Sequence, residues 1–168
     1  MKRTTYMRSL LIVTIFLISC NRSIVKQPHY ENQIGDTPFN AYLDTDDFKF
    51  CDPTNVLHKR SLVTYKGGTR AFEQQLIKNY NYKLSYEPYS GYFIIRFAVN
   101  CSDQAGRYRM ETLDVNFNPS KHPTEFQEHI LSTVKELKGW RHAFYQGKDY
   151  DCYKFITIKI INGQIQKT

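Results

Sequence analysis

The sequence predicts an α+β fold in which two helices pack on one face of a small antiparallel sheet, in the order α-β-β-α-β-β. Three patterns carry this prediction. Apolar residues alternate along 92–99, as in a strand with one buried face. Apolar residues also recur at helical spacing in 69–80 and 124–137, which indicates two amphipathic helices. A second alternation over 150–161 supplies the closing strand.

The first helix is expected to follow the glycine pair Gly67 and Gly68. Thr69 is the candidate N-cap, because its hydroxyl can accept a hydrogen bond from a first-turn N–H. The apolar face consists of Phe72, Leu76 and Tyr80. Their spacing of i, i+4 and i+8 predicts about three turns with one side turned to the core.

The first two strands are expected to form an antiparallel pair joined by the polar turn 100–106. The core-facing residues of the first strand are Phe93, Ile95, Phe97 and Val99. The second strand is predicted over 107–117, and its apolar residues change parity between Met110 and Leu113. A β-bulge near 111–113 would produce that one-residue offset.

The second helix is predicted to begin at Thr124, after the strand-ending segment 118–123. Thr124 and Gln127 have the spacing of a capping box. The apolar face consists of Phe126, Ile130, Val134 and Leu137. Gly139 stands where a C′ glycine would end the helix.

After this helix the pattern indicates a short strand over 140–145 and a final strand over 150–161. The core-facing residues of the final strand are Ile156, Ile158 and Ile160. Lys154, Thr157 and Lys159 lie among them, so we expect this strand to be partly exposed and near a sheet edge.

The segment 1–19 has the pattern of a secretory signal, with three basic residues among the first eight and an apolar run over 10–18. That run is too short to cross a bilayer as a helix, which takes about 20 residues. Ser19 before Cys20 resembles the lipobox of bacterial lipoproteins, in which the cysteine becomes the lipidated N-terminus. An ordinary signal peptide cut elsewhere and an uncleaved anchor are the alternatives.

This interpretation divides the chain into a signal peptide at 1–19, a lipidated cysteine with a flexible tether over 20–40, and one domain over 41–168. The tether is polar, contains proline and glycine, and shows no periodicity. The core of the domain is expected within 64–163. A chain of this length supports one such domain.

The net charge of +7 does not indicate a nucleic-acid partner. Three of the basic residues lie in the predicted signal, and acidic and basic residues are well mixed along the rest of the chain, without a block of like charge. Nucleic-acid binding requires a basic stripe or patch, which this pattern lacks. The sequence therefore favours a partner that is not nucleic acid.

Besides Cys20, the cysteines are Cys51, Cys101 and Cys152, an odd number for an exported protein. Three single pairings are open. A bond between Cys51 and Cys101 is favoured, since both lie in polar segments, whereas Cys152 lies in a strand pattern and suits a buried apolar position. No neighbouring base marks any of them as a nucleophile.

Other polar clusters give no catalytic or metal-binding signature. The histidines are His29, His58, His122, His129 and His142, and no two have the i, i+4 spacing of a helical metal site. They are interpreted as surface residues. Asp44, Asp46, Asp47 and Asp52 lack the glycine and the closing glutamate of a calcium loop and are interpreted as an acidic loop.

Asp149 and Asp151 could pair for acid–base chemistry, but the polar face of an amphipathic strand also requires such residues. They are therefore interpreted as a solvated strand face. No glycine pattern frames a serine as a nucleophile elbow. We expect no enzyme activity, no cofactor and no metal site.

Several landmarks, taken in order, resemble the C-terminal domain of TonB-family proteins. They are Tyr65-Lys66-Gly67-Gly68 before the first helix, Phe72 within it, Tyr80-Asn81-Tyr82 after it, the strand from Gly91 to Asn100, Gly106, Leu137-Lys138-Gly139-Trp140, and the closing strand from Phe155 to Ile160. The resemblance covers 64–163. It implies the predicted fold and a mode of peptide binding.

The chain also departs from that family. A TonB energy transducer has an inner-membrane helix and a long proline-rich spacer, whereas this chain has a lipobox and only six prolines. Arg141, His142 and Ala143 follow Trp140, where the family leads us to expect a proline. The resemblance therefore does not carry force transduction to this chain.

These observations predict a non-catalytic envelope lipoprotein of a Gram-negative bacterium that binds a protein or peptide partner. Asn21 after the cysteine favours an outer-membrane anchor facing the periplasm, by analogy with lipoprotein sorting. Peptide capture is expected by strand addition to the final strand. The candidate edge residues are Tyr153, Phe155, Thr157, Ile158 and Lys159. The alternative is an immunity or inhibitor lipoprotein that binds a toxin or hydrolase in the periplasm.

Overall fold

Helices and antiparallel strands share one apolar core in the computed structural model, which describes residues 39–167 and confirms the predicted α+β class. The predicted signal peptide 1–19, Cys20 and nearly all of the tether 20–40 lie outside the described residues.

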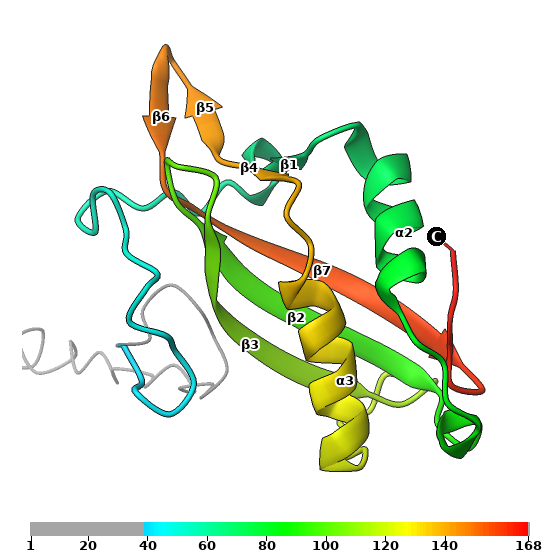
Figure 1. The fold of residues 1–168 in the computed structure, drawn as a ribbon. Coiled ribbons are helices and arrows are strands. Elements are labelled where there is room, and N and C mark those ends of the chain that lie inside the picture. The colour runs from blue at the N-terminus through cyan, green and yellow to red at the C-terminus, as the bar shows by residue number, and fades with distance from the viewer. Residues whose placement is uncertain (1–38, 168) are drawn as a thin grey trace, which may run out of the picture. The chain divides into compact units, whose positions relative to one another are not determined.

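The central sheet has four antiparallel strands in the order β3-β2-β7-β8 (Figure 1). These strands are β2 (Gly91–Val99), β3 (Ala105–Leu113), β7 (Cys152–Ile161) and β8 (Gln164–Ile165). β2 and β7 pair over nine residues, from Gly91 opposite Ile160 to Val99 opposite Cys152. Alternation places every second side chain of each strand on one face, as the sequence predicts.

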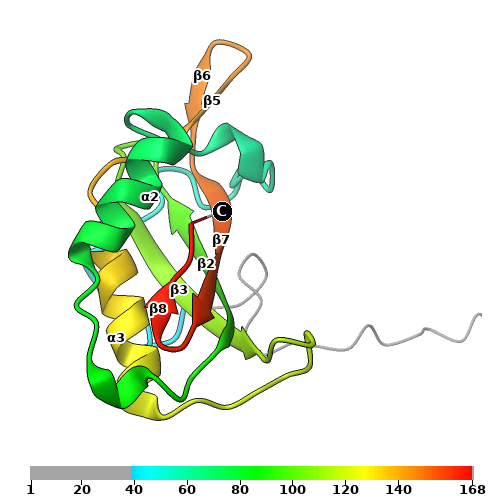
Figure 2. The ribbon, with the colours of Figure 1, turned by 90° about the vertical axis from the view of Figure 1, so that its right-hand side faces the viewer.

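Two helices cover that face: α2 (Gly68–Asn79) and α3 (Thr124–Lys135). Figure 2 shows both helices on the same side of the sheet. The buried residues that meet between the layers are Leu76, Phe126, Ile130, Val134, Phe93, Ile95, Phe97, Val99, Ile156, Ile158 and Ile160. The sequence patterns of both helices and of the two long central strands are therefore confirmed.

Shorter elements complete the fold. They are the 3-10 turns η1 (Arg60–Leu62) and η2 (Leu84–Tyr86), the pair β1 (Thr64–Tyr65) with β4 (Trp140–Arg141), and the hairpin β5 (Ala143–Tyr145) with β6 (Lys148–Tyr150). The β5–β6 hairpin projects beyond the end of the sheet (Figures 1 and 2). Its turn residues Gln146 and Gly147 have φ values of 49° and 78°, typical of a two-residue hairpin loop.

The final segment differs from the prediction at its boundaries. The strand expected over 140–145 is divided into β4 and β5. Tyr150 belongs to β6, so the long strand begins at Cys152 rather than at residue 150. The β6 pairing with β5 explains this, because Asp151 lies between two separate ladders.

Neither helix is capped as predicted. The N-cap of α2 is Gly67, at φ 85°, and that of α3 is Pro123; neither makes a side-chain capping bond. Gln127 instead donates from Nε2 to the carbonyl of His122 at 2.7 Å. The predicted Thr69 cap and the capping box at Thr124 are therefore wrong.

Gly139 is not the C′ residue of α3, which ends at Lys135. It lies against the ring of Tyr65, and a Cβ at this position would stand 2.4 Å from the Tyr65 Cζ atom. Close packing against an aromatic ring, rather than helix termination, accounts for the glycine.

The second strand ends at Leu113 and not at residue 117. The residues that follow form a turn, in which the N–H of Phe117 donates to the carbonyl of Asp114 at 3.1 Å. The parity change arises because Leu113 pairs with Tyr92 on the face opposite the core, while Val115 and Phe117 lie exposed in this turn. The bulge lies elsewhere, at Arg107–Tyr108, because β3 has two residues between the partners of Arg96 and Ala98 where β2 has one.

Residues 39–59 include a segment fastened to the sheet face opposite the helices by a buried ion pair. Asp44 accepts hydrogen bonds from both terminal nitrogens of Arg109, at 2.6 and 2.9 Å. Burial opposes ionisation of Asp44, but the bonds from Arg109 and from the N–H of Asn40 outweigh it and lower the pKa of this carboxyl. Within the predicted acidic loop, Asp44 is therefore buried, whereas Asp46, Asp47 and Asp52 are exposed.

Replacing Asp44 by alanine should destabilise the fold by about 3–5 kcal/mol, because the buried guanidinium of Arg109 would lose its counterion. Urea unfolding of the wild type and of Asp44→Ala would measure this difference in free energy. The matched control is Asp46→Ala, two residues away and exposed. Equal effects of the two substitutions would show that the ion pair contributes little.

Candidate functional site

The strand expected to offer an open edge, β7, is not the last strand of the sheet. The short strand β8 pairs with its end, at Ile160 and Ile161, and Leu57 forms a parallel bridge with Cys152 at its start. The stretch Lys154–Ile158 lies between these two contacts. The edge is therefore partial, and both of its ends are closed by this chain.

Hydrogen bonds at the two ends show which backbone groups of this stretch point away from β2. The N–H of Tyr153 donates to the Leu57 carbonyl, and the carbonyl of Lys159 accepts from the N–H of Gln166, both at 2.9 Å. Because backbone direction alternates along a strand, the N–H and C=O groups of Phe155 and Thr157 point outward too. Within residues 39–167 these four groups have no backbone partner.

A groove of about 370 Å³ runs beside this open edge. We call it the β7 groove. Its lining residues are Ser61, Val63, Thr64, Tyr65, Gly68, Thr69, Phe72, Trp140, Lys154, Phe155, Ile156 and Thr157. The walls thus come from the η1–β1 segment, the first turns of α2, β4 and β7 itself.

The five predicted edge residues divide into two groups in the structure. Phe155, Thr157 and Lys159 are exposed, as a binding edge requires. Tyr153 is buried beneath the rings of Phe50 and His58, and the side chain of Ile158 lies in the core. The side chains of these last two residues are therefore not accessible to a partner.

Aromatic residues form part of the lining of the β7 groove. The ring centroid of Trp140 lies 5.1 Å from that of Tyr65 and 5.5 Å from that of Phe72. These residues come from β4, β1 and α2 and are far apart in the sequence. Their common position could not be inferred from any local pattern.

The groove also contains the ammonium group of Lys154, which donates to the carbonyl oxygens of Val63 at 2.9 Å and Arg60 at 3.1 Å. Burial lowers the pKa of this lysine. Lys154 occupies a core-facing position of β7, opposite Phe97. In the sequence, Lys154 indicated only a partly exposed strand near an edge; its core-facing position beside a groove follows from the pairing with β2.

The other edge of the sheet is less suited to pairing with a further strand. β3 carries the bulge at Arg107–Tyr108, and Arg109 donates from Nη1 to the Tyr108 carbonyl at 2.9 Å. The carbonyl of Thr112 accepts from the N–H of Ser120 at 3.0 Å. Bulges and charged groups at an edge are features that limit strand addition.

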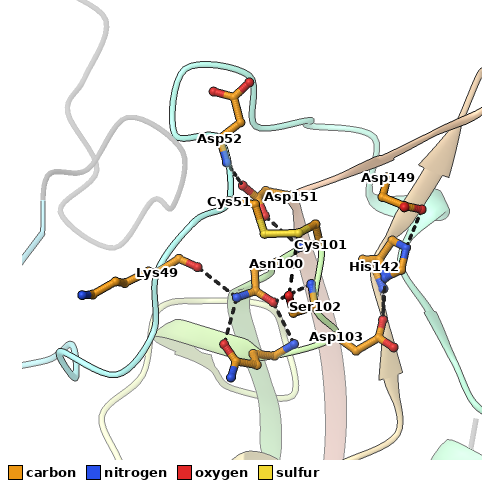
Figure 3. Close-up of a disulfide and its surroundings, with 11 residues drawn as sticks. Lys49, Cys51, Asp52, Asn100, Cys101, Ser102, Asp103, His142, Asp149 and Asp151 are labelled. Carbon is orange, nitrogen blue, oxygen red and sulfur yellow. Dashed lines mark hydrogen bonds and ion pairs between the residues drawn. A yellow bond between two sulfur atoms is a disulfide. The ribbon is translucent and has the colours of Figure 1, made fainter.

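A second polar cluster lies at the end of the sheet away from β8, around a disulfide between Cys51 and Cys101 (Figure 3). This is the pairing favoured in the sequence analysis, and Cys152 is buried with a free thiol. The carboxylate of Asp151 accepts from the N–H groups of Asp52 and Cys101, each at 2.8 Å. Asp151 is therefore a buried structural residue, and its interpretation as part of a solvated face is wrong.

His142 lies between two carboxylates in the same region (Figure 3). Its Nδ1 is 2.7 Å from Asp103 Oδ1 and its Nε2 is 2.8 Å from Asp149 Oδ1. Burial opposes protonation of His142, but the bonds to Asp149 and Asp103 outweigh it and raise its pKa. His142 is thus a partly buried connector between the β2–β3 turn and the β5–β6 hairpin, not a simple surface histidine.

This arrangement does not support catalysis by His142, because both ring nitrogens are engaged by carboxylates and neither is placed to activate a nucleophile. The ligand atoms of Cys51, Cys101 and Asp151 lie within 4.8 Å of one another. The two sulfurs form the disulfide, however, and metal binding requires thiolates.

No protein-family model, curated protein or solved structure matches this chain. Among the helices of residues 39–167, none has the length and apolar character needed to cross a membrane. The fold and the site define an α+β protein with a partial open edge beside an aromatic groove.

The stability of the protein should fall as pH rises above about 6.5, the ordinary pKa of histidine. The pKa of His142 is raised in the folded state, so protonation of this residue stabilises the fold. That contribution is complete below this pH and is lost as the pH rises through the folded-state pKa. Burial lowers the pKa of His122, so the pH range in which this residue changes the stability lies below about 6.5, and the change has the opposite sign. Urea unfolding between pH 6.5 and 8.5 would measure the trend.

The control for this experiment is His142→Gln, which keeps a hydrogen-bond donor but does not titrate. The decline in stability over this pH range should flatten in the variant. A decline of unchanged size would mean that another group is responsible.

Proposed function

We propose that this protein is a lipid-anchored, non-catalytic binding module of the bacterial cell envelope that captures an extended peptide segment of a protein partner. The observation that supports this most directly is the open edge of β7, where four backbone groups of Phe155 and Thr157 point outward beside a groove. A peptide strand placed there would gain backbone hydrogen bonds and side-chain contacts together.

The two edges of the sheet differ in a way that favours this site. The β3 edge carries a bulge and an arginine bonded to the adjacent carbonyl. The β7 edge is closed at each end but open between, so it can accept only a short segment. A partial edge of this kind limits unspecific sheet extension while leaving room for a selected partner.

The relation to TonB C-terminal domains forms part of this proposal and is supported by the order of landmarks in 64–163. The proposal covers the fold and strand addition only. A lipobox in place of an inner-membrane helix favours a fixed lipid anchor, and Asn21 after the cysteine favours the outer membrane, where the domain would face the periplasm.

Thr157→Pro should abolish partner capture without unfolding the sheet. The N–H of Thr157 points away from β2, so proline removes an outward donor and places its ring in the path of an added strand, while the β2–β7 ladder remains. Ile158→Pro would be a poor test, because the N–H of Ile158 points toward β2 and its side chain lies in the core.

The experiment is capture of envelope proteins on immobilised full-length protein, compared for the wild type, Thr157→Pro and the matched control Thr157→Val, which keeps the N–H. A partner retained by the wild type and the valine variant, and reduced about tenfold or more by proline, supports strand addition. Equal retention by all three would exclude this edge.

The alternative is an immunity or inhibitor lipoprotein, and one structural feature favours it. The β5–β6 hairpin projects from the body (Figure 1), and Phe144 within it is 64% exposed. His142 connects the base of this hairpin to Asp103, so the projection is held in place. A single toxin or hydrolase retained by Thr157→Pro as strongly as by the wild type would favour this alternative.

The lipid anchor can be tested separately. Cys20→Ala removes the only side chain that the lipobox pattern allows to be acylated, so the protein should be released from the membrane or remain as an unprocessed precursor. Fractionation of cells with detection of the protein would show this. Unchanged retention of a processed protein in the membrane fraction would contradict the anchor.

A further inference from the structure

The β7 groove contains positive charge that the described part of the chain does not neutralise. Lys154 is partly buried, and its ammonium group donates only to the carbonyls of Arg60 and Val63. The six ion pairs among residues 39–167 all involve other cations. A partly buried ammonium without a carboxylate partner is unfavourable, and an anion bound beside it would offset that cost.

A second cation stands at the same end of the open edge. The guanidinium carbon of Arg60 lies 4.5 Å from the ring centroid of Phe155, which lines the groove. Arg60 also has no carboxylate partner within residues 39–167. Because side chains alternate along β7, Phe155 projects to the face opposite Lys154, so the two cations flank the backbone groups of the open edge on opposite faces.

The aromatic residues Tyr65, Phe72 and Trp140 lie in the same groove as Lys154. They belong to the side of the sheet that the helices cover, and Lys154 projects to that side as well, since it pairs with core-facing Phe97. In an extended peptide, side chains on one face are separated by two residues. A carboxylate for Lys154 and an apolar group for the aromatic residues would thus be two positions apart.

We propose that the β7 groove selects an extended peptide in which a carboxylate lies two residues from a large apolar side chain, with the carboxylate beside Lys154 and the apolar group against Tyr65, Phe72 and Trp140. The carboxylate can be an acidic side chain or the C-terminus of the partner, because both offer the same acceptor. This inference rests on the proposed function and adds the chemistry of the partner.

The test uses two display libraries of random heptapeptides, one flanked on both sides and one ending in a free C-terminus, selected on the full chain in mild detergent. Enrichment of Asp or Glu two positions from Leu, Ile, Phe or Tyr in the flanked library would identify a side-chain carboxylate. Enrichment of such apolar residues near the end of the second library alone would identify a C-terminal carboxylate.

Trp140 provides a direct readout, because it is the only tryptophan in the chain. Selected peptides without tryptophan should change its fluorescence on binding. Lys154→Gln should weaken binding about tenfold or more, since it removes the charge from the carboxylate contact. The control Lys121→Gln, an exposed residue between β3 and α3, should change affinity less than twofold.

The outcomes separate the two proposals. Selected peptides without an acidic preference, or equal affinity in the Lys154 and Lys121 variants, would overturn this inference and leave strand addition intact. Failure to enrich any peptide above the level seen with Thr157→Pro would overturn both. The glutamine in Lys154→Gln keeps a donor for the carbonyls of Arg60 and Val63, and a thermal melt would confirm that the variant folds.

Discussion

The nine-residue pairing of β2 with β7 is the constraint on which the rest of the structure depends. It joins segments about 60 positions apart in the chain and decides the direction of every group in β7. Even-numbered side chains turn to the helices, and odd-numbered backbone groups turn away from β2. A slip of one residue would expose Ile156, Ile158 and Ile160 and would move the outward N–H groups to other residues.

The remaining parts of the chain limit how much of this outward edge is accessible. Leu57 and the disulfide-linked loop close one end, and β8 closes the other. On the opposite face of the sheet, the ion pair of Asp44 with Arg109 holds the preceding segment in place. The open stretch is therefore a defined opening of a few residues, and α2 with β1 and β4 gives it side walls.

Local periodicity was sufficient to predict the two helices, β2 and the polarity of β7, because each pattern reports one buried face of one element. Partners distant in sequence were not predictable. Asp44 and Asp151 are acidic residues in polar surroundings, and only their contacts with Arg109 and with the N–H groups of Asp52 and Cys101 explain their burial. The β7 groove could not be predicted for the same reason, because its walls come together only in the folded chain.

Asp151 also bears on how the three cysteines of residues 39–167 yield one disulfide. By holding the backbones of Asp52 and Cys101, it brings the two half-cystines to a Cα separation of 6.1 Å. The third thiol, Cys152, is fully buried, and burial raises its pKa to about 11. Thiol–disulfide exchange requires an accessible and ionised thiol. In the folded chain the thiol of Cys152 is neither, so it does not compete with the pairing of Cys51 and Cys101. The folded arrangement therefore favours the bond between Cys51 and Cys101 over any pairing with Cys152.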